Sequence, residues 1–189
     1  MRPRVLRRAD HRRMPWKNGG GETFEIAVGP DGAGLDTFAW RVSLALVERD
    51  GPFSVFPGID RILTVVEGGG IALDFGPERR MELSRVDAPF EFPGEAPVLG
   101  HLLDGPIVDL NVMTRRGAAR ATVERFAKGW KDDLPPGRIG IVYCHRGHIG
   151  LASPDWLVTL EEGDAALIER PSRLRADVDG LGFRIDIAA

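Results

Sequence analysis

Alternation of apolar and polar positions, the pattern of a half-buried strand, is the main regularity of this chain. In residues 40–47, Trp40 and Val42 begin one face, whereas Arg41 and Ser43 begin the other. The spacing therefore predicts a strand with one apolar and one partly polar face. No comparably long stretch follows the period of a helix.

Short apolar segments separated by glycine and proline follow this strand. Residues 62–66 and 71–75 flank a glycine triplet at 68–70, which predicts a β-hairpin. Residues 120–126 are interpreted as a strand, and residues 129–137, with two aspartates and two prolines, as a connector. Further short runs lie at residues 89–92, 98–103 and 110–113. Many short strands at this spacing predict an all-β sandwich or barrel.

The chain also matches itself when it is shifted by 77 positions. Arg61 then falls on Arg138, and Gly70 falls on Gly147. The same offset aligns Ile62 with Ile139, Val65 with Val142, Pro77 with Pro154, Leu83 with Leu160, and Asp87-Ala88 with Asp164-Ala165. A constant offset over several strands indicates a duplicated β unit.

The segment LEEGDAALIERP, residues 160–171, resembles the double-stranded β-helix of cupins, in which a Gly-Asp turn precedes an inward-facing strand. Two such units make a bicupin, so the expected fold is all-β, with two jelly-roll-like barrels in one compact chain. We expect the ligand cavity in residues 1–116. Residues 117–189 are expected to form a structural barrel, which N-terminal strands could complete.

Composition narrows the function classes. With 25 basic and 28 acidic residues, the net charge of -3 gives no electrostatic reason to expect a nucleic-acid partner. The arginine-rich start, residues 2–13, is interpreted as an edge strand. No apolar run is long enough to span a membrane, and no signal-peptide core is present. Together with the single cysteine, Cys144, these features predict a cytoplasmic protein.

Histidine and cysteine offer little catalytic or metal chemistry. An inward HxH strand, the usual cupin metal motif, is missing, since His145 and His148 are three positions apart. We expect both histidines to face solvent on a hairpin, and we expect no metal and no cofactor. Cys144 and His145 point to opposite faces of a strand, so the thiol is predicted to be buried and inert.

Two segments offer groups for binding an anion. In MPWKNGGGETFEI, residues 14–26, Trp16, Lys17 and Asn18 precede a glycine triplet. Such a loop can present main-chain N–H groups to an anion, with Lys17 supplying charge. An ordinary turn with Trp16 as a hydrophobic plug explains the same residues equally well.

The second set lies on strand faces. Arg41 and Ser43 share one face of their strand, and Asp109 and Asn111 share one face of another. If the faces that carry Arg41, Ser43 and Asn111 turn inward together, a cation, a hydroxyl and an amide line a cavity suited to a small carboxylate. General acid–base catalysis by Glu22, Glu25 and Asp60 is the alternative use of such a cavity. Binding is favoured because no nucleophile–base pair is evident.

Three segments carry a resemblance to a known family: MPWKNGGGETFEI, WRVSLALVERDGPFSVFPGIDR and LLDGPIVDLNVMTRR. They resemble the motifs of the HutD family, also called the Ves family. The resemblance implies a bicupin without the usual metal-binding histidines. It also implies a regulator that limits flux through histidine utilisation, with N-formylglutamate or formate as the bound signal.

The expected function is therefore non-enzymatic binding of a small carboxylate that modulates histidine utilisation. The candidate ligand-binding residues are Trp16, Lys17, Asn18, Arg41, Ser43, Phe56, Asp60, Arg61 and Asn111. Two alternatives stay open, namely a metal-independent hydrolase or isomerase acting on a similar metabolite, and a protein-interaction module. Homodimerisation is also left open.

Overall fold

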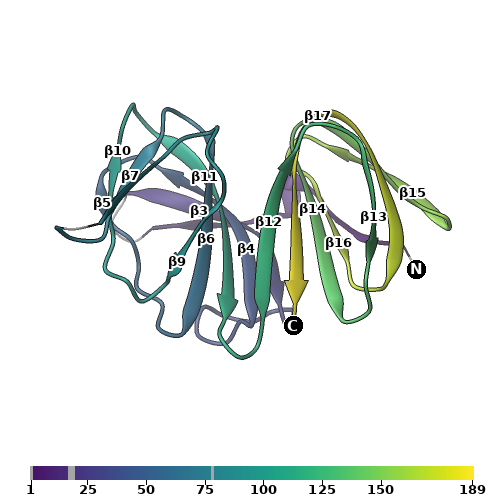
Figure 1. Ribbon diagram of the computed structural model, residues 1–189, viewed down its shortest axis with the longest axis horizontal. Coiled ribbons are helices and arrows are strands. Elements are labelled where there is room, and N and C mark those ends of the chain that lie inside the picture. The colour runs from purple at the N-terminus through teal and green to yellow at the C-terminus, as the bar shows by residue number, and fades with distance from the viewer. Residues whose placement is uncertain (1, 17–19, 78) are drawn as a thin grey trace. The chain divides into compact units, whose positions relative to one another are not determined.

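A computed structural model describes residues 2–16, 20–77 and 79–189. The regular secondary structure of these residues is almost entirely β-strand (Figure 1), with one short 3₁₀ helix, η1 (Arg8–Asp10), and no α-helix. The predicted all-β class is thereby confirmed. No helix in the described ranges has the length and apolar character needed to cross a membrane.

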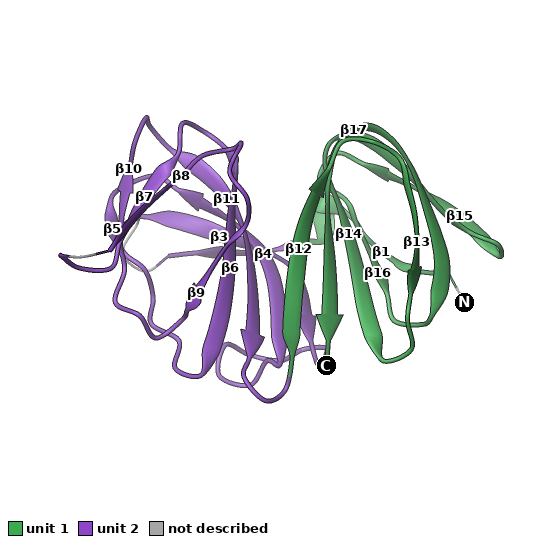
Figure 2. Ribbon diagram, viewed as in Figure 1, with its two compact units in different colours: residues 1–11, 119–189 green, residues 12–118 purple. Residues whose placement is uncertain are grey.

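The chain divides into two compact units (Figure 2). Unit 2 comprises residues 12–118, and unit 1 comprises residues 119–189 together with residues 1–11. The first eleven residues join unit 1 because β1 (Arg4–Leu6) pairs with β16 (Ala165–Ile168), at the edge of the sheet. The strand expected near the start of the chain is present there.

Unit 2 contains two sheets. The six-stranded sheet has the order β2-β3-β4-β11-β6-β9, and the four-stranded sheet has the order β5-β10-β7-β8. The strands of the first sheet are β2 (Arg12–Pro15), β3 (Gly21–Gly29), β4 (Trp40–Val47), β11 (Ile107–Arg115), β6 (Ile59–Glu67) and β9 (Phe90–Pro93). Those of the second are β5 (Gly51–Pro52), β10 (Leu99–Leu102), β7 (Ile71–Asp74) and β8 (Arg80–Leu83).

Unit 1 forms a single seven-stranded sheet, because two of its strands are very long. The path is β1-β16-β14-β17-β12, with β13 attached to β17 and β15 attached to β14. The remaining bounds are β12 (Arg120–Phe126), β13 (Trp130–Leu134), β14 (Arg138–Ser153), β15 (Trp156–Glu161) and β17 (Ser172–Ala188).

Strand pairing in the two units follows the same plan. The order β4-β11-β6-β9 in unit 2 matches β12-β17-β14-β16 in unit 1, and β5-β10-β7-β8 matches β13-β17-β14-β15. Ile71 pairs with Leu102, and 77 positions further along the chain His148 pairs with Asp179. The internal repeat seen in the sequence is therefore matched by the hydrogen-bonded ladders.

Two local predictions are wrong. The segments on either side of the glycine triplet are strands, β6 and β7, but they belong to different sheets and form no hairpin. Gly68 and Gly70 have φ of 89° and 125°, which lets the chain pass from one sheet to the other. The expected connector at residues 129–137 contains β13, whose partner β17 supplies a ladder that the local sequence does not reveal.

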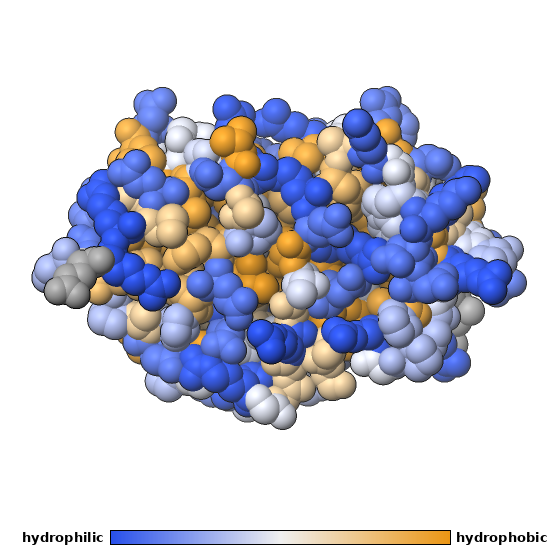
Figure 3. All heavy atoms as spheres, viewed as in Figure 1, coloured by the Kyte–Doolittle hydropathy of each residue, from blue (hydrophilic) through white to orange (hydrophobic). Residues whose placement is uncertain are grey.

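The interiors of the two units differ. Unit 1 is filled by a closely packed apolar cluster that includes Ile149, Leu151 and Leu160, all fully buried. Unit 2 has an apolar cluster around Leu63, Ile71 and Leu73, but part of its interior remains open. On the surface shown in Figure 3, polar residues are spread widely and apolar residues form small groups between them.

Candidate functional site

Unit 2 contains a cavity of about 510 Å³, a size typical of small-molecule sites. Both sheets of the unit contribute to its wall. The polar lining residues are Thr23, Arg41, Ser43, Arg49, Asp50, Ser54, Arg61, Asp109 and Asn111. The main apolar ones are Met14, Pro15, Trp16, Leu35, Ala45, Val47, Pro52, Phe53, Phe56 and Met113.

The polar wall arises because neighbouring strands present their odd-numbered residues to the cavity. Asn111 on β11 lies in register with Ser43 on β4, and Met113 lies in register with both Arg41 on β4 and Arg61 on β6. Side chains alternate along a strand, so the even-numbered positions face the other side of the sheet. The two polar faces noted in the sequence thus meet at one site.

Arg41 is held by an ion pair within this wall. Its Nε donates to Oε2 of Glu25 at 2.6 Å, and the two side chains are 7% and 11% exposed. Met14 Sδ lies 4.0 Å from Nη2 of the same guanidinium. Glu25 therefore neutralises Arg41. Removing either partner of such a buried pair would leave the other charge uncompensated and destabilise the fold.

Arg61 has no comparable partner. Its buried guanidinium lies over the rings of Phe53 and Phe56, at 5.0 and 6.0 Å from their centroids, and Nη1 makes one long hydrogen bond of 3.4 Å to the carbonyl of Ser54. Nε is buried without a hydrogen-bond partner. Burial lowers the pKa of Arg61 to about 10, which leaves the group charged at neutral pH. The cavity thus holds a cation with an unused donor.

Asp109 is the acidic counterpart of this arginine. It is fully buried in the cavity wall, and neither carboxylate oxygen has a well-formed hydrogen bond. Burial raises the pKa of Asp109 to about 7, although the charge of Arg61 and the amide of Asn111 each oppose this. Asp109 and Arg61 form no direct ion pair among those found in the described chain. The carboxyl group therefore titrates near neutral pH.

The other predicted site residues fall into three groups. Ser43 and Asn111 are buried in the wall, and Asn111 Oδ1 lacks a hydrogen-bond partner. Trp16 also lines the cavity, and its indole N–H donates to Thr23 Oγ1 at 2.8 Å. Lys17 and Asn18 lie outside the described residues.

Asp60 is not among the cavity-lining residues. It accepts a hydrogen bond from Nε of Arg116 at 2.7 Å. The reason is the strand period, because adjacent residues such as Asp60 and Arg61 on β6 point to opposite faces. Glu22, a candidate general acid or base, forms an ion pair with Arg13 instead.

Three residues of the site are absent from the set of binding residues predicted from the sequence: Asp109, Glu25 and Phe53. The alternation in DLNVMTRR, residues 109–116, already placed Asp109 on the face of Asn111, so this signal was available. Phe53 lies in an irregular loop, where no periodicity indicates direction. Its place over Arg61 becomes visible only in three dimensions.

Cysteine and histidine residues lie mainly outside this site. Cys144 is fully buried, as predicted, and burial raises its pKa to about 11. The expectation for His145 is wrong, because this residue is only 5% exposed; β14 continues through its position rather than turning there. His148 is exposed. Among the residues that the structure describes, no group of three or more His, Cys, Asp or Glu side chains is placed to hold a metal ion.

Taken together, these features define a β-sheet protein with a charged, aromatic-walled cavity. A cupin 2 conserved barrel domain protein from Leptotrichia buccalis has a similar fold, with a TM-score of 0.55 at 13% identity over 88% of each chain. The HutD family model matches residues 8–185, and the chain belongs to the HutD family, which is associated with histidine utilisation. The HutD/Ves resemblance of the sequence is thereby confirmed.

Individual relatives agree with this assignment. Protein Ves from Cronobacter sakazakii is 39% identical over 158 residues, which cover 82% of this chain and 83% of the relative. An uncharacterised 21.2 kDa protein from the hutC 3′ region of Pseudomonas putida is 44% identical over 122 residues. That match covers 65% of this chain and 63% of the relative's length, less than two thirds. The structure of HutD from Pseudomonas fluorescens SBW25, in a formate condition, has a TM-score of 0.86 and 28% identity, covering 98% of each chain.

Proposed function

We propose that this chain binds a small carboxylate in the cavity of unit 2 and thereby modulates histidine utilisation without catalysing a reaction. The candidate ligands are N-formylglutamate and formate. The observation that carries the proposal is the buried guanidinium of Arg61, whose Nε lacks a partner and lines the cavity. A buried donor without a partner is costly, and a carboxylate oxygen is the acceptor that it lacks.

The surroundings of Arg61 support an anionic ligand. Arg41 is neutralised by Glu25, whereas Arg61 forms no ion pair among those found in the described chain and so provides the positive charge that attracts an anion. Ser43 and Asn111 offer a hydroxyl and an amide on the same wall. The rings of Phe53 and Phe56 exclude water from the guanidinium, which strengthens its attraction for an anion. The formate condition named for the Pseudomonas fluorescens relative is consistent with this chemistry.

The proposed fold is a bicupin, with one double-stranded β-helix barrel in each unit. Its support is the common strand order of the two units and the shared 77-position offset of their central ladders. In this proposal only the first barrel keeps a binding cavity, and the second is structural. The protein is proposed to act in the cytoplasm.

Calorimetric titration with N-formylglutamate, formate, glutamate and urocanate tests the function. We expect binding of at least one of the first two, and loss of that binding in Arg61→Met, which removes the charge but keeps an apolar side chain for the aromatic rings. Arg116→Met is the matched control, because Arg116 pairs with Glu95 and Asp60 away from the cavity.

Two results would contradict the proposal. One is the absence of binding to all four compounds, and the other is unchanged binding by Arg61→Met. Conversion of a bound compound into a product, followed by mass spectrometry, would replace the binding function with an enzymatic one.

A further inference from the structure

We propose that Asp109 acts as a proton-carrying selector of the cavity: it binds the ligand as a carboxylic acid and donates its O–H to one carboxylate oxygen of the ligand. The inference rests on the proposed function and assigns to this residue a role in it. Arg61 would hold the charge of the ligand, and Asp109 would distinguish a carboxylate from other groups.

The position of Asp109 is unusual for a carboxylate. Its side chain is fully buried, and both oxygens lack a well-formed hydrogen bond. Its cross-strand neighbours are apolar, Ala45 on β4 and Val65 on β6. Leaving an ionised carboxylate in such a place costs several kcal/mol in general. A protonated carboxyl avoids that cost and has one O–H that needs an acceptor.

The charged groups around the cavity determine which class of ligand can enter and accept the hydrogen bond from the O–H of protonated Asp109. Arg41 on β4 is paired with Glu25 on β3, so this pair is neutral. Arg61 on β6 attracts anions, and ionised Asp109 would cancel this attraction. Protonation of Asp109 therefore leaves one net positive charge on the buried wall of the cavity.

Further from Asp109, the segment after β4 adds two charges to the lining, Arg49 and Asp50. Asp50 accepts hydrogen bonds from the backbone N–H of Leu102, at 2.8 Å, and interacts with the ring of His101, at 3.1 Å. Both Arg49 and Asp50 are exposed, so solvent screens them more strongly than the buried groups. Arg49 and Asp50 therefore do not change the net positive charge of the buried wall that Arg61 and protonated Asp109 form.

The proton balance of binding follows directly. At a pH where free Asp109 is ionised, a carboxylate enters together with one proton from solvent, and that proton stays on an oxygen of Asp109. The ligand remains ionised and pairs with Arg61. Burial already raises the pKa of Asp109 to about 7, and the negative charge of a ligand raises it further. Proton uptake is thus partial at neutral pH and nearly complete in mildly alkaline solution.

Formate and formamide form a matched pair of probes for this step. Formate binding to the intact protein is measured by calorimetry from about pH 6 to about pH 9, in two buffers of different ionisation enthalpy, which counts the protons taken up. We expect the Kd of formate to rise about tenfold per pH unit above the pKa of free Asp109, with uptake approaching one proton. Neutral formamide can accept the O–H of protonated Asp109 or donate an N–H to its ionised form, so its binding should vary much less with pH.

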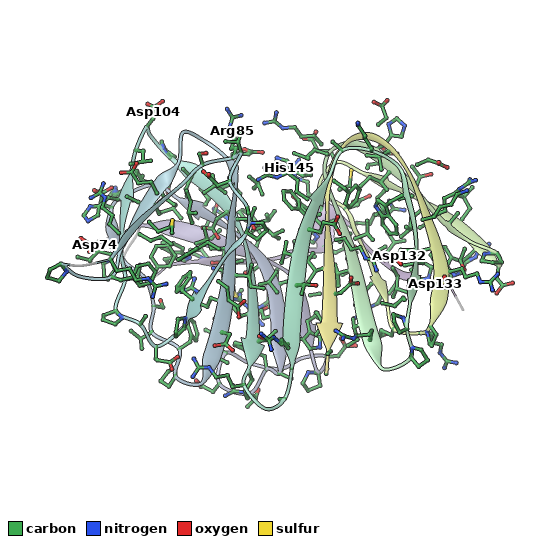
Figure 4. The ribbon with its side chains drawn as sticks, in the orientation of Figure 1. Asp74, Arg85, Asp104, Asp132, Asp133 and His145 are labelled. Carbon is green, nitrogen blue, oxygen red and sulfur yellow. The ribbon has the colours of Figure 1, made fainter. Side chains whose placement is uncertain are left out.

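Asp109→Asn keeps the shape of the side chain and removes the titration, so its Kd for formate should not vary with pH over this range. Asp104→Asn is the matched control: Asp104 lies in the loop after β10, exposed and pointing outward (Figure 4), and this variant should behave as the wild type. Cooperative urea denaturation of each variant shows that it is folded.

The outcomes separate the two proposals. Formate binding without proton uptake, or the same pH dependence in Asp109→Asn, overturns the role of Asp109 and leaves carboxylate binding intact. The absence of carboxylate binding at every pH overturns the proposed function, and the role of Asp109 with it.

Discussion

Replacing Asp109 by asparagine should stabilise the ligand-free protein at neutral and alkaline pH. The substitution keeps the size of the side chain and removes a carboxyl group that becomes charged while fully buried. Burial raises the pKa of Asp109 from 3.8 to about 7. Because one pH unit of difference corresponds to about 1.4 kcal/mol, the ionised group costs the folded protein at most about 4 kcal/mol.

The sign follows from proton binding. Between pH 3.8 and about 7, the folded state holds a proton on Asp109 that the unfolded state has lost. The contribution of this residue to the free energy of unfolding is therefore fully present at low pH and is lost as the pH rises through this window. Asp109→Asn lacks this loss. The difference between its free energy of unfolding and that of the wild type therefore grows from pH 4 to pH 7 and is constant above about pH 8.

Urea denaturation of both proteins across this range measures the effect. The difference between the two curves is the relevant quantity, because burial lowers the pKa of His11 and gives both proteins an opposite trend near its usual pKa. Asp104→Asn, at an exposed position, should follow the wild type. A difference between Asp109→Asn and the wild type that stays constant with pH would refute the reasoning, since it would mean that Asp109 does not titrate in this window.

Two further predictions concern other buried groups. Glu25→Gln leaves Arg41 without its charged partner and should lower the free energy of unfolding by about 3 to 5 kcal/mol; a loss below about 1 kcal/mol in urea denaturation would mean that the pair behaves as an exposed one. Cys144, fully buried with a pKa raised to about 11, should not react with a thiol reagent in the folded protein and should react promptly in denaturant. Rapid labelling of the folded protein would contradict its burial.

The sequence indicates which residues share a face of a strand better than it indicates which strands pair in a sheet. Period two correctly placed Arg41 and Ser43 on one face of their strand and Asn111 on the corresponding polar face of a second strand, since the side chains of a strand alternate whatever its partners are. The same rule, applied strictly, would have separated Asp60 from Arg61 and added Asp109 to the set. The alternation in the sequence therefore contains the information that separates these residues.

Strand pairing could not be predicted from local sequence, because it depends on residues far apart in the chain. The segments around Gly68–Gly70 look like a hairpin locally, yet β6 pairs with β9 and β11, and β7 pairs with β8 and β10. β13 could not be recognised from its own residues, because its ladder is formed with β17, whose residues lie about forty positions further along the chain. His145 was misplaced for the same reason, since the length of β14 is determined by its partners β16 and β17.

The two repeats differ in how their sheets are connected, and this affects the size of molecule that each can admit. In unit 1, β14 and β17 pair with β16 and β12 in one part of the sheet and with β15 and β13 in the other. Any widening of the interior would therefore have to bend or break a continuous ladder. In unit 2, the corresponding strands are interrupted, and the two described sheets share no strand. A change in the spacing of these two sheets would break no ladder, only the apolar contacts that they share. The repeat with interrupted strands is thus the one whose interior can differ in width without a change in strand pairing.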